Sequence, residues 1–327
     1  MKKRLISVTI VLVMLLTMFL CGCGSKKEHI LIYTSVEDYV IEDMSARLKE
    51  EFPNYEITVE YVSTGNHAAK LLAEGTNTEC DITYDLEYGY MEQLAQSGVL
   101  ADLTSYDQSI YPADTVVSNN YLIQCRVGGA IILNTEILAQ KNLPEPTSYE
   151  DLLKPEYAGL ISMANPKSSG TGYMFLKSLV NVWGETEAFA YFDALTPNIL
   201  QYTSSGSGPV NALLQGEAAI GLGMTSHAVT QINEGAPLKV VFFDEGSPFT
   251  LYGQSMIAGK DSRECVREVF NFLVNTYSYE LNEKFFPEQI FNDASFTVEN
   301  YPQNIVYADM SNNTIDEKVR LLDMWKY

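Results

Sequence analysis

The feature that most constrains the fold is a recurring unit in which an apolar strand ends in a turn rich in Ser, Thr and Gly and a helix follows. The clearest example runs from the apolar residues 159–164 through Ser-Ser-Gly-Thr-Gly at 168–172 to a helix predicted over 174–183. The first amides of a helix lack partners within the helix and carry partial positive charge. Glycines let backbone approach a ligand, so this turn suits an anion, although the same residues would also serve as an ordinary N-cap.

The first part of the chain repeats this alternation with short connections. Apolar periodicity predicts strands and helices in strict alternation, over 29–35, 37–51, 55–62, 67–73, 80–84 and 90–96. Such alternation predicts a parallel sheet with helices on its faces. Ligands bind at the carboxyl ends of the strands in such sheets, and here those ends carry Thr34, Ser35 and the turn 63–65.

Two long extended segments then connect this unit to a second one. Residues 121–134, with Gly128 and Gly129 in the middle, and residues 252–258 are predicted to cross between two lobes. We expect an α/β, two-lobed fold, in which each lobe is a mainly parallel sheet with flanking helices and a cleft lies between the lobes. The expected parts are lobe one, lobe two, and a second crossing with C-terminal helices that pack on both lobes, over 29–128, 129–250 and 251–327.

The N-terminus has the pattern of a bacterial lipoprotein signal. Three basic residues precede an uncharged apolar stretch, 5–20, and a Leu-Cys-Gly-Cys sequence follows at 20–23. We expect residues 1–22 to be removed and Cys23 to carry the lipid, with 23–28 as a tether. An acyl chain would hold the protein at the outer face of the cytoplasmic membrane without spanning it.

Composition excludes some partners. Removing the three basic residues of the signal from 21 leaves 18 against 42 acidic residues, which argues against nucleic acid as a partner. The three cysteines outside the signal and lipidation region, Cys80, Cys125 and Cys265, allow at most one disulfide, and we expect buried free thiols. Their spacing does not suit a zinc site. We expect no cofactor and a monomer.

Several segments together resemble a known family. The lipoprotein signal, residues 32–35, 128–134, 165–173 and 216–221 are similar, in this order, to those of the extracellular solute-binding proteins of ABC importers. The subgroup that the chain resembles comprises the ferric-iron, phosphonate and sugar-phosphate binders, of the periplasmic binding protein type 2 fold. The resemblance covers nearly the whole mature chain, and the Ser-Ser-Gly-Thr-Gly turn is its most specific part.

The resemblance implies a set of ligand contacts from both lobes. The expected contacts are Thr34, Ser35, Thr64 and Gly65 from lobe one and Ser168, Ser169, Gly170, Thr171, Ser205, Thr225, Ser226, His227 and Glu245 from lobe two, with Tyr252 available for stacking. Iron binders of this group carry adjacent tyrosines near 225–227, and this chain has none there. Sugar-phosphate binders are more similar, with a His in that turn and an acid after the next strand.

We therefore expect a binding protein, not an enzyme, that captures a small phosphorylated or phosphonate-type anion and delivers it to a permease and its ATPase. Ferric iron, thiamine or a polyamine are alternatives, because Glu37, Asp85, Glu87, Asp244 and Glu245 could serve a cation. A surface sensor or adhesin of the same fold is a further alternative. A serine hydrolase is disfavoured because no Gly-x-Ser-x-Gly elbow is present and only three histidines could supply the base.

Overall fold

The computed structural model describes residues 27–113 and 115–327. The signal peptide expected at 1–22, most of the expected tether and the lipidation site expected at Cys23 lie outside these residues. Within the described part, none of the helices combines the length and the apolar character that crossing a membrane requires.

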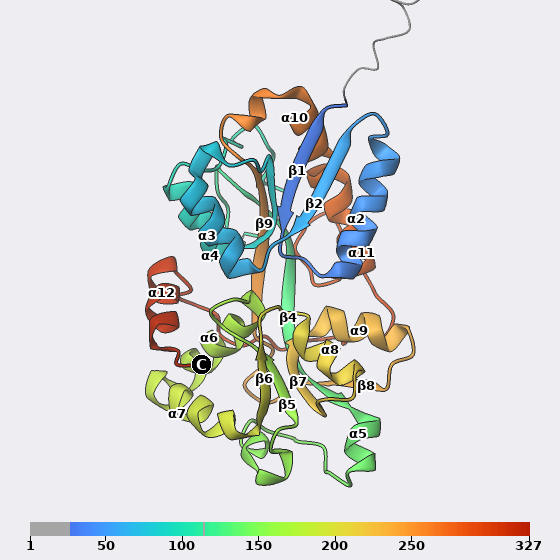
Figure 1. Ribbon diagram of the computed structural model, residues 1–327, viewed down its shortest axis with the longest axis vertical. Helices are drawn as coiled ribbons and strands as arrows, with labels where there is room; N and C mark the ends of the chain where they lie inside the picture. Colours follow the sequence, from blue (N-terminus) through green and yellow to red (C-terminus); the bar gives the residue numbers. More distant parts are fainter. Residues whose placement is uncertain (1–26, 114) are drawn as a thin grey trace, which may run out of the picture.

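The strands of the described residues join into one mixed sheet that runs the length of the molecule (Figure 1). Its order is β2-β1-β3-β9-β4-β7-β5-β6, and β8 pairs with β4. The strands are β1 (His29–Thr34), β2 (Glu56–Tyr61), β3 (Ile82–Glu87), β4 (Leu122–Asn134), β5 (Ile161–Ala164), β6 (Ile199–Thr203), β7 (Ile220–Met224), β8 (Leu238–Val241) and β9 (Phe249–Met256). The pairs β1–β2, β1–β3, β5–β6 and β5–β7 are parallel.

Strand β4 connects the two halves of the sheet. Its residues up to Gly128 pair antiparallel with β9, and those from Gly129 pair antiparallel with β7. Figure 1 shows β4 running down the centre of the molecule from one lobe into the other. We call β1–β3 with α2–α4, α10 and α11 the first lobe, and β5–β8 with α5–α9 the second lobe. We propose to divide the two lobes between Gly128 and Gly129, because β4 changes its pairing partner there.

The helices cover the faces of each half of the sheet, and α12 lies beside the junction of the lobes (Figure 1). They are α2 (Asp38–Glu51), α3 (Thr64–Glu74), α4 (Tyr88–Gln96), α5 (Thr135–Gln140), α6 (Gly170–Trp183), α7 (Glu185–Leu195), α8 (Gly208–Leu214), α9 (Thr225–Asn233), α10 (Glu264–Phe272), α11 (Ser278–Lys284) and α12 (Ile315–Met324). Short 3₁₀ turns fill some connections, and a π-helical turn, Leu273–Tyr277, joins α10 to α11.

The α/β, two-lobed prediction is confirmed, with differences in detail. The sheet is mixed, because the crossing strands β4 and β9 pair antiparallel with their neighbours. Helices α7 and α11 and strand β6 were not predicted from the sequence, and residues 225–227, which begin α9, were expected to form a turn. Helix α6 begins at Gly170, four residues before its predicted start. Residues 170–180 are all buried, so packing overrides the weak helix propensity of the two glycines.

The cysteine prediction is confirmed for the described residues. Cys80, Cys125 and Cys265 are buried and form no disulfide. Burial raises the pKa of the Cys80 thiol to about 12, so it stays protonated at neutral pH. These thiols pack as small apolar groups.

Candidate ligand-binding site

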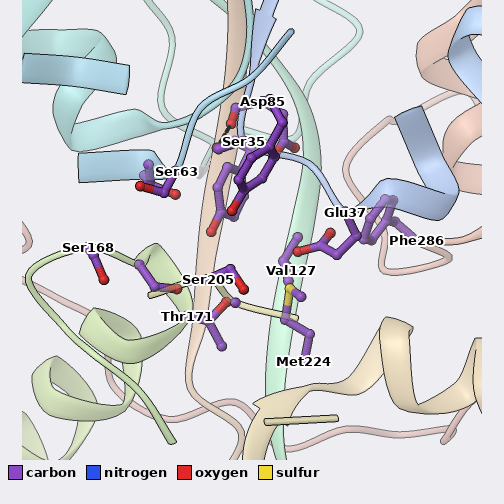
Figure 2. Close-up of a pocket in the computed structure, with 15 residues that line it drawn as sticks. Ser35, Glu37, Ser63, Asp85, Val127, Ser168, Thr171, Ser205, Met224 and Phe286 are labelled. Atoms are coloured by element: carbon purple, nitrogen blue, oxygen red, sulfur yellow. Dashed lines mark hydrogen bonds between the residues drawn. The ribbon is translucent and has the colours of Figure 1, made fainter. Parts of the chain in front are cut away.

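A small cavity lies where the two lobes face each other across β4 (Figure 2). Side chains of the first lobe and of the second lobe line it from opposite sides, and Val127, Tyr252 and Phe286 also belong to its lining. The remaining lining residues are Ser35, Glu37, Tyr61, Ser63, Thr64, Asp85, Ser168, Ser169, Thr171, Ser205, Gly206 and Met224. None of these described lining residues is a Lys, Arg or His, so hydroxyls and carboxyls supply the polarity of this cavity.

Two helix N-termini from different lobes meet at this cavity. Helix α3 begins at Thr64 and helix α6 begins at Gly170, and neither helix has a side-chain cap. At the start of α6 the amides of Ser168 and Ser169 both donate to the carbonyl of Asn165. The amides of Gly170 and Thr171 have no backbone acceptor among the described residues. Free amides at two helix starts place partial positive charge on both sides of the cavity.

Three largely buried residues of the cavity wall have hydroxyls without a partner in the described part of the chain. Thr64 is 6% exposed, Ser169 is 5% exposed and Thr171 is 2% exposed, and the side-chain oxygen of none of them makes a hydrogen bond to a described residue. Their oxygens stay accessible from the cavity, since none of them is among the fully enclosed side-chain atoms that lack a partner. Because all three line the cavity, a bound solute can satisfy them together.

The lobes touch directly at the edge of the cavity. The amide of Gly65 donates to the carbonyl of Ser168 at 3.2 Å. A Cβ atom at Gly65 would lie 2.6 Å from the carbonyl oxygen of Lys167, closer than real Cβ atoms come, so glycine permits this approach. The structure is therefore a closed form of the two lobes.

The opposite side of the cavity is acidic. Glu37 and Asp85 are 9% and 4% exposed, and both belong to the first lobe. Burial, and the charge of Asp85, raise the pKa of Glu37 to about 8. Burial also raises the pKa of Asp85 to about 7, although the hydrogen bonds from Gln124 and Ser35 oppose the shift. Both carboxyls are thus poised to change charge near neutral pH when their surroundings change.

Half of the expected contacts lie together at the cavity. Its lining includes seven of them: Ser35, Thr64, Ser168, Ser169, Thr171, Ser205 and Tyr252. Gly65 and Gly170 adjoin it through their backbone, and the hydroxyl of Tyr252 lies against Gly170. Thr34 does not reach the cavity, because it is fully buried and its Oγ1 accepts from the amide of Val36 at 3.2 Å. Lys167 is exposed and is not part of the lining.

The expected contacts at the start of α9 do not line the cavity. Thr225, Ser226 and His227 are buried behind Met224, and the His227 ring stacks on Tyr39 of the first lobe with ring centroids 5.4 Å apart. Burial lowers the pKa of His227 to about 4, so it is neutral near pH 7 instead of titrating there. Glu245 is also outside the lining, half-buried near Tyr149.

The structure adds residues that the sequence analysis did not place in the site. Tyr61, Gly206, Met224, Val127 and Phe286 are brought to the cavity by tertiary packing, and Ser63 lines it from the turn expected after β2. Glu37 and Asp85 had been named only for the cation alternative. The sequence did contain a signal for both residues. Glu37 follows β1 and Asp85 lies near the end of β3, and the carboxyl ends of these strands face the cleft, where ligands bind in such sheets.

The sequence profile of a bacterial extracellular solute-binding protein family matches residues 78–298. The chain belongs to this family. The match spans β3 of the first lobe, both crossing strands and the whole second lobe, so it includes the second-lobe side of the cavity. Members of the family are solute-binding proteins rather than enzymes, and this one is a solute-binding protein of the ABC-importer class.

Individual relatives agree with this assignment. An uncharacterised protein of Haemophilus influenzae is 31% identical over 250 residues, covering 73% of this chain and 70% of its own. The spermidine/putrescine-binding periplasmic protein of Escherichia coli is 23% identical over 277 residues, covering 79% and 76%. The solved periplasmic binding protein AfuA of Actinobacillus pleuropneumoniae, with exogenous fructose-6-phosphate bound, is 25% identical with a TM-score of 0.80, covering 92% of this chain and 98% of its own.

Proposed function

We propose that this solute-binding protein captures a small solute with a phosphoryl or phosphonate group in the cavity between the lobes and delivers it to the permease of an ABC importer. The observation that carries the proposal is the set of three cavity-lining hydroxyls of Thr64, Ser169 and Thr171, which have no partner among the described residues and lie at two facing helix starts. A phosphoryl group has three acceptor oxygens and negative charge, so it can accept from hydroxyls and free amides at once.

Helix starts and hydroxyls can hold an anion without basic residues. The free amides of Gly170 and Thr171 add donors directly beside the Thr171 hydroxyl. Ser168 and Ser205 lie on the same side of the cavity, as Figure 2 shows, and extend the donor set of the second lobe. The similar fold of AfuA, solved with a sugar phosphate bound, supports the same class of solute.

Closure of the two lobes is the proposed mechanism of capture. Donors at Thr64 belong to the first lobe and donors at Thr171 to the second, so a solute bridging them binds the closed form more tightly than an open one. A ligand shifts a conformational equilibrium only by this difference in affinity. The closed form would then dock on the permease, with the protein held at the membrane surface by a lipid on Cys23.

A thermal-shift and calorimetric screen tests the proposal. Glucose 6-phosphate, 2-aminoethylphosphonate, ferric citrate, thiamine and putrescine would each be added to the purified full chain. Binding to the native state raises its melting temperature. We expect stabilisation by at least one phosphorus compound at submillimolar concentration. If only iron, thiamine or putrescine stabilises the protein, the proposed phosphorylated solute is wrong and the solute is the corresponding cation.

A cationic solute is the second candidate, because two buried carboxyls, Glu37 and Asp85, line the cavity. The similarity to a polyamine-binding protein is consistent with it. The phosphorylated solute is favoured because a cation alone would leave the hydroxyls and amides at the two helix starts without an acceptor.

A further inference from the structure

Glu37 is a buried carboxylate that faces the cavity without a partner. It is the residue before α2, and Figure 2 shows its carboxylate directed into the space between the lobes. It is 9% exposed, and its side chain makes no hydrogen bond or ion pair with residues 27–113 or 115–327. A buried carboxylate without a partner is strongly unfavourable in its charged form.

Asp85 is a second carboxylate held toward the same space under backbone strain. Its φ is 55°, a left-handed conformation that is uncommon for residues other than glycine, and the pairing of β3 with β9 shifts register around it. Its Oδ1 atom accepts from Nε2 of Gln124 at 2.8 Å and from Sγ of Cys125 at 4.0 Å, and the Ser35 hydroxyl donates to its carbonyl. Strained residues of this kind cluster at functional sites.

The two carboxyls repel each other, and neither has a cationic partner among the described residues of the cavity. Arg126 on β4 instead lies over the Phe249 and Tyr307 rings, and Lys318 of α12 is paired with Glu87. A solute that presented only an anion would offer these carboxyls no cation and would favour their protonated forms. A sugar hydroxyl can donate to a carboxylate but cannot neutralise it.

We propose that the solute carries a protonated amine as well as its phosphoryl or phosphonate group, with the anion on the hydroxyls and amides of the helix starts and the ammonium between Glu37 and Asp85. This inference rests on the proposed function, and it narrows the solute to a small aminated phosphate or phosphonate. The ammonium supplies three donors and one positive charge, which matches a carboxylate pair better than a neutral group does.

Two matched ligand pairs test this inference by calorimetry on the full chain. In each pair one compound has an amine where the other has a methyl or hydroxyl group: 2-aminoethylphosphonate against propylphosphonate, and glucosamine 6-phosphate against glucose 6-phosphate. We expect at least one amine-bearing compound to bind tenfold or more tightly than its amine-free partner. Glu37→Gln should reduce this ratio to near one, and Asp85→Asn should do the same. The control Glu42→Gln, at an exposed position of α2, should keep the ratio unchanged.

The outcomes separate this inference from the proposed function. Equal or tighter binding of the amine-free compounds overturns the aminated solute and leaves a phosphorylated solute in place. A ratio that survives both Glu37→Gln and Asp85→Asn overturns the assignment of the amine to these carboxyls. Putrescine binding more tightly than every phosphorus compound, or no phosphorus compound binding at all, overturns both proposals.

Discussion

The amide of Gly65 on the first lobe donates to the carbonyl of Ser168 on the second lobe at 3.2 Å, so the two lobes are joined by a backbone hydrogen bond at the edge of the cavity. No side chain mediates this contact. It lies between the starts of α3 and α6, the two helices that we propose hold the anion.

Gly65→Ala should impair closure while leaving the fold intact. The new Cβ would lie 2.6 Å from the carbonyl oxygen of Lys167, and a backbone atom has to move to relieve the clash. Only the closed form bears this cost, which for overpacking is about 1–3 kcal/mol, so ligand affinity should fall roughly 5- to 100-fold. Alanine also favours the helix, so the urea midpoint of the unliganded chain should not fall.

Small-angle scattering checks the mechanism of this loss. Ligand should compact the wild-type chain and should compact Gly65→Ala less at equal concentration. A variant that binds and compacts like the wild type would show that the lobes do not need this contact.

Thr171→Val removes a cavity hydroxyl without changing the side-chain shape much. A hydrogen bond to a charged group contributes about 1.5–3 kcal/mol, so the affinity for a phosphorylated solute should fall roughly 10-fold or more. Thr186→Val, at an exposed position on α7, is the matched control and should bind normally. Calorimetry measures both variants. Equal affinities for the two variants would remove Thr171 from the proposed site.

The pH dependence of stability should report the buried Glu37 carboxyl. Glutamate titrates near pH 4.3 when unfolded, whereas burial raises the pKa of Glu37 to about 8 in the folded chain. Between these values the folded state holds a proton that the unfolded state has lost. The unliganded protein should therefore lose stability as pH rises through this window, by up to about 1.4 kcal/mol per pH unit for this proton.

Neighbouring groups define the pH range and the control for this measurement. Burial lowers the pKa values of His67 and His227, so these histidines make the stability rise with pH below about pH 6.5. The measurement therefore uses the range of about pH 6.5–8.5, where only the loss due to raised carboxyl pKa values remains. Asp85, Asp38 and the phenols of Tyr39, Tyr61 and Tyr252 surround Glu37 and are unchanged in the variant. Urea unfolding should show a flatter slope for Glu37→Gln than for Glu42→Gln. Parallel slopes would contradict the raised pKa.

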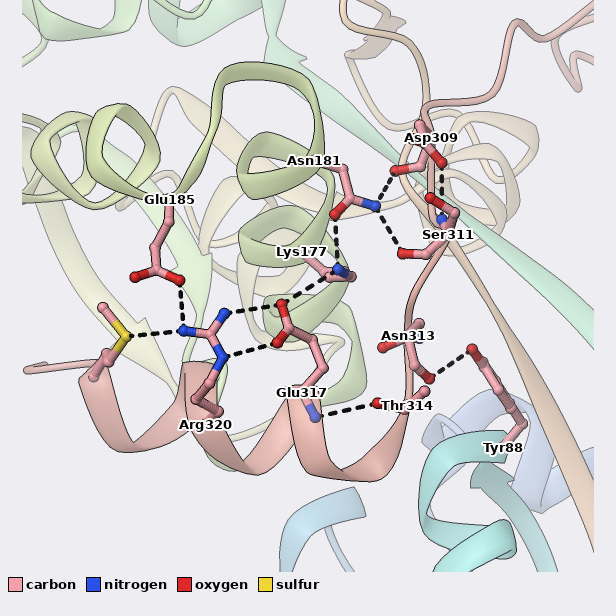
Figure 3. A network of polar contacts seen from close by, with 11 residues as sticks. Tyr88, Lys177, Asn181, Glu185, Asp309, Ser311, Asn313, Thr314, Glu317 and Arg320 are labelled. Carbon is pink, nitrogen blue, oxygen red and sulfur yellow. Dashed lines mark hydrogen bonds and ion pairs between the residues drawn. The ribbon is translucent and has the colours of Figure 1, made fainter.

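Lys318→Met should destabilise the protein through the junction of the lobes. Lys318 on α12 forms a buried ion pair with Glu87 of β3, and its ammonium lies 4.0 Å from the Tyr90 ring centroid and 4.4 Å from that of Tyr173. Figure 3 shows the neighbouring network, in which Glu317 of α12 pairs with Lys177 of α6 and with Arg320. Removing the cation leaves Glu87 buried and unpaired, which costs about 3–5 kcal/mol. Urea unfolding measures the loss.

Two further variants make this prediction specific. Lys326→Met breaks an exposed pair with Asp193 and should change stability little. Adding Glu87→Gln to Lys318→Met should restore much of the loss, because the unpaired charge is gone. A loss no larger than that of Lys326→Met would mean that α12 does not hold the lobes through this pair.

The sequence by itself determined the class of fold and predicted one side of the proposed site. Apolar periodicity located most strands and helices, and the residue types of the turn 168–172 predicted a candidate anion site or an ordinary N-cap. Local patterns of this kind depend on neighbours in the chain, so they can be read without the structure. The resemblance to the solute-binding family predicted Ser35, Thr64 and Ser205 as ligand contacts, and all three line the cavity.

The tertiary structure alone decided which polar groups meet. The sequence placed 225–227 and Glu245 at the solute, but packing against Tyr39 and near Tyr149 takes them out of the lining. The sequence named Glu37 and Asp85 only for a cationic solute. In the folded chain both are buried and line the same cavity as the two helix starts. Burial and mutual approach arise between residues far apart in the chain, and these determine pKa values and ligand complementarity. No local pattern encodes them.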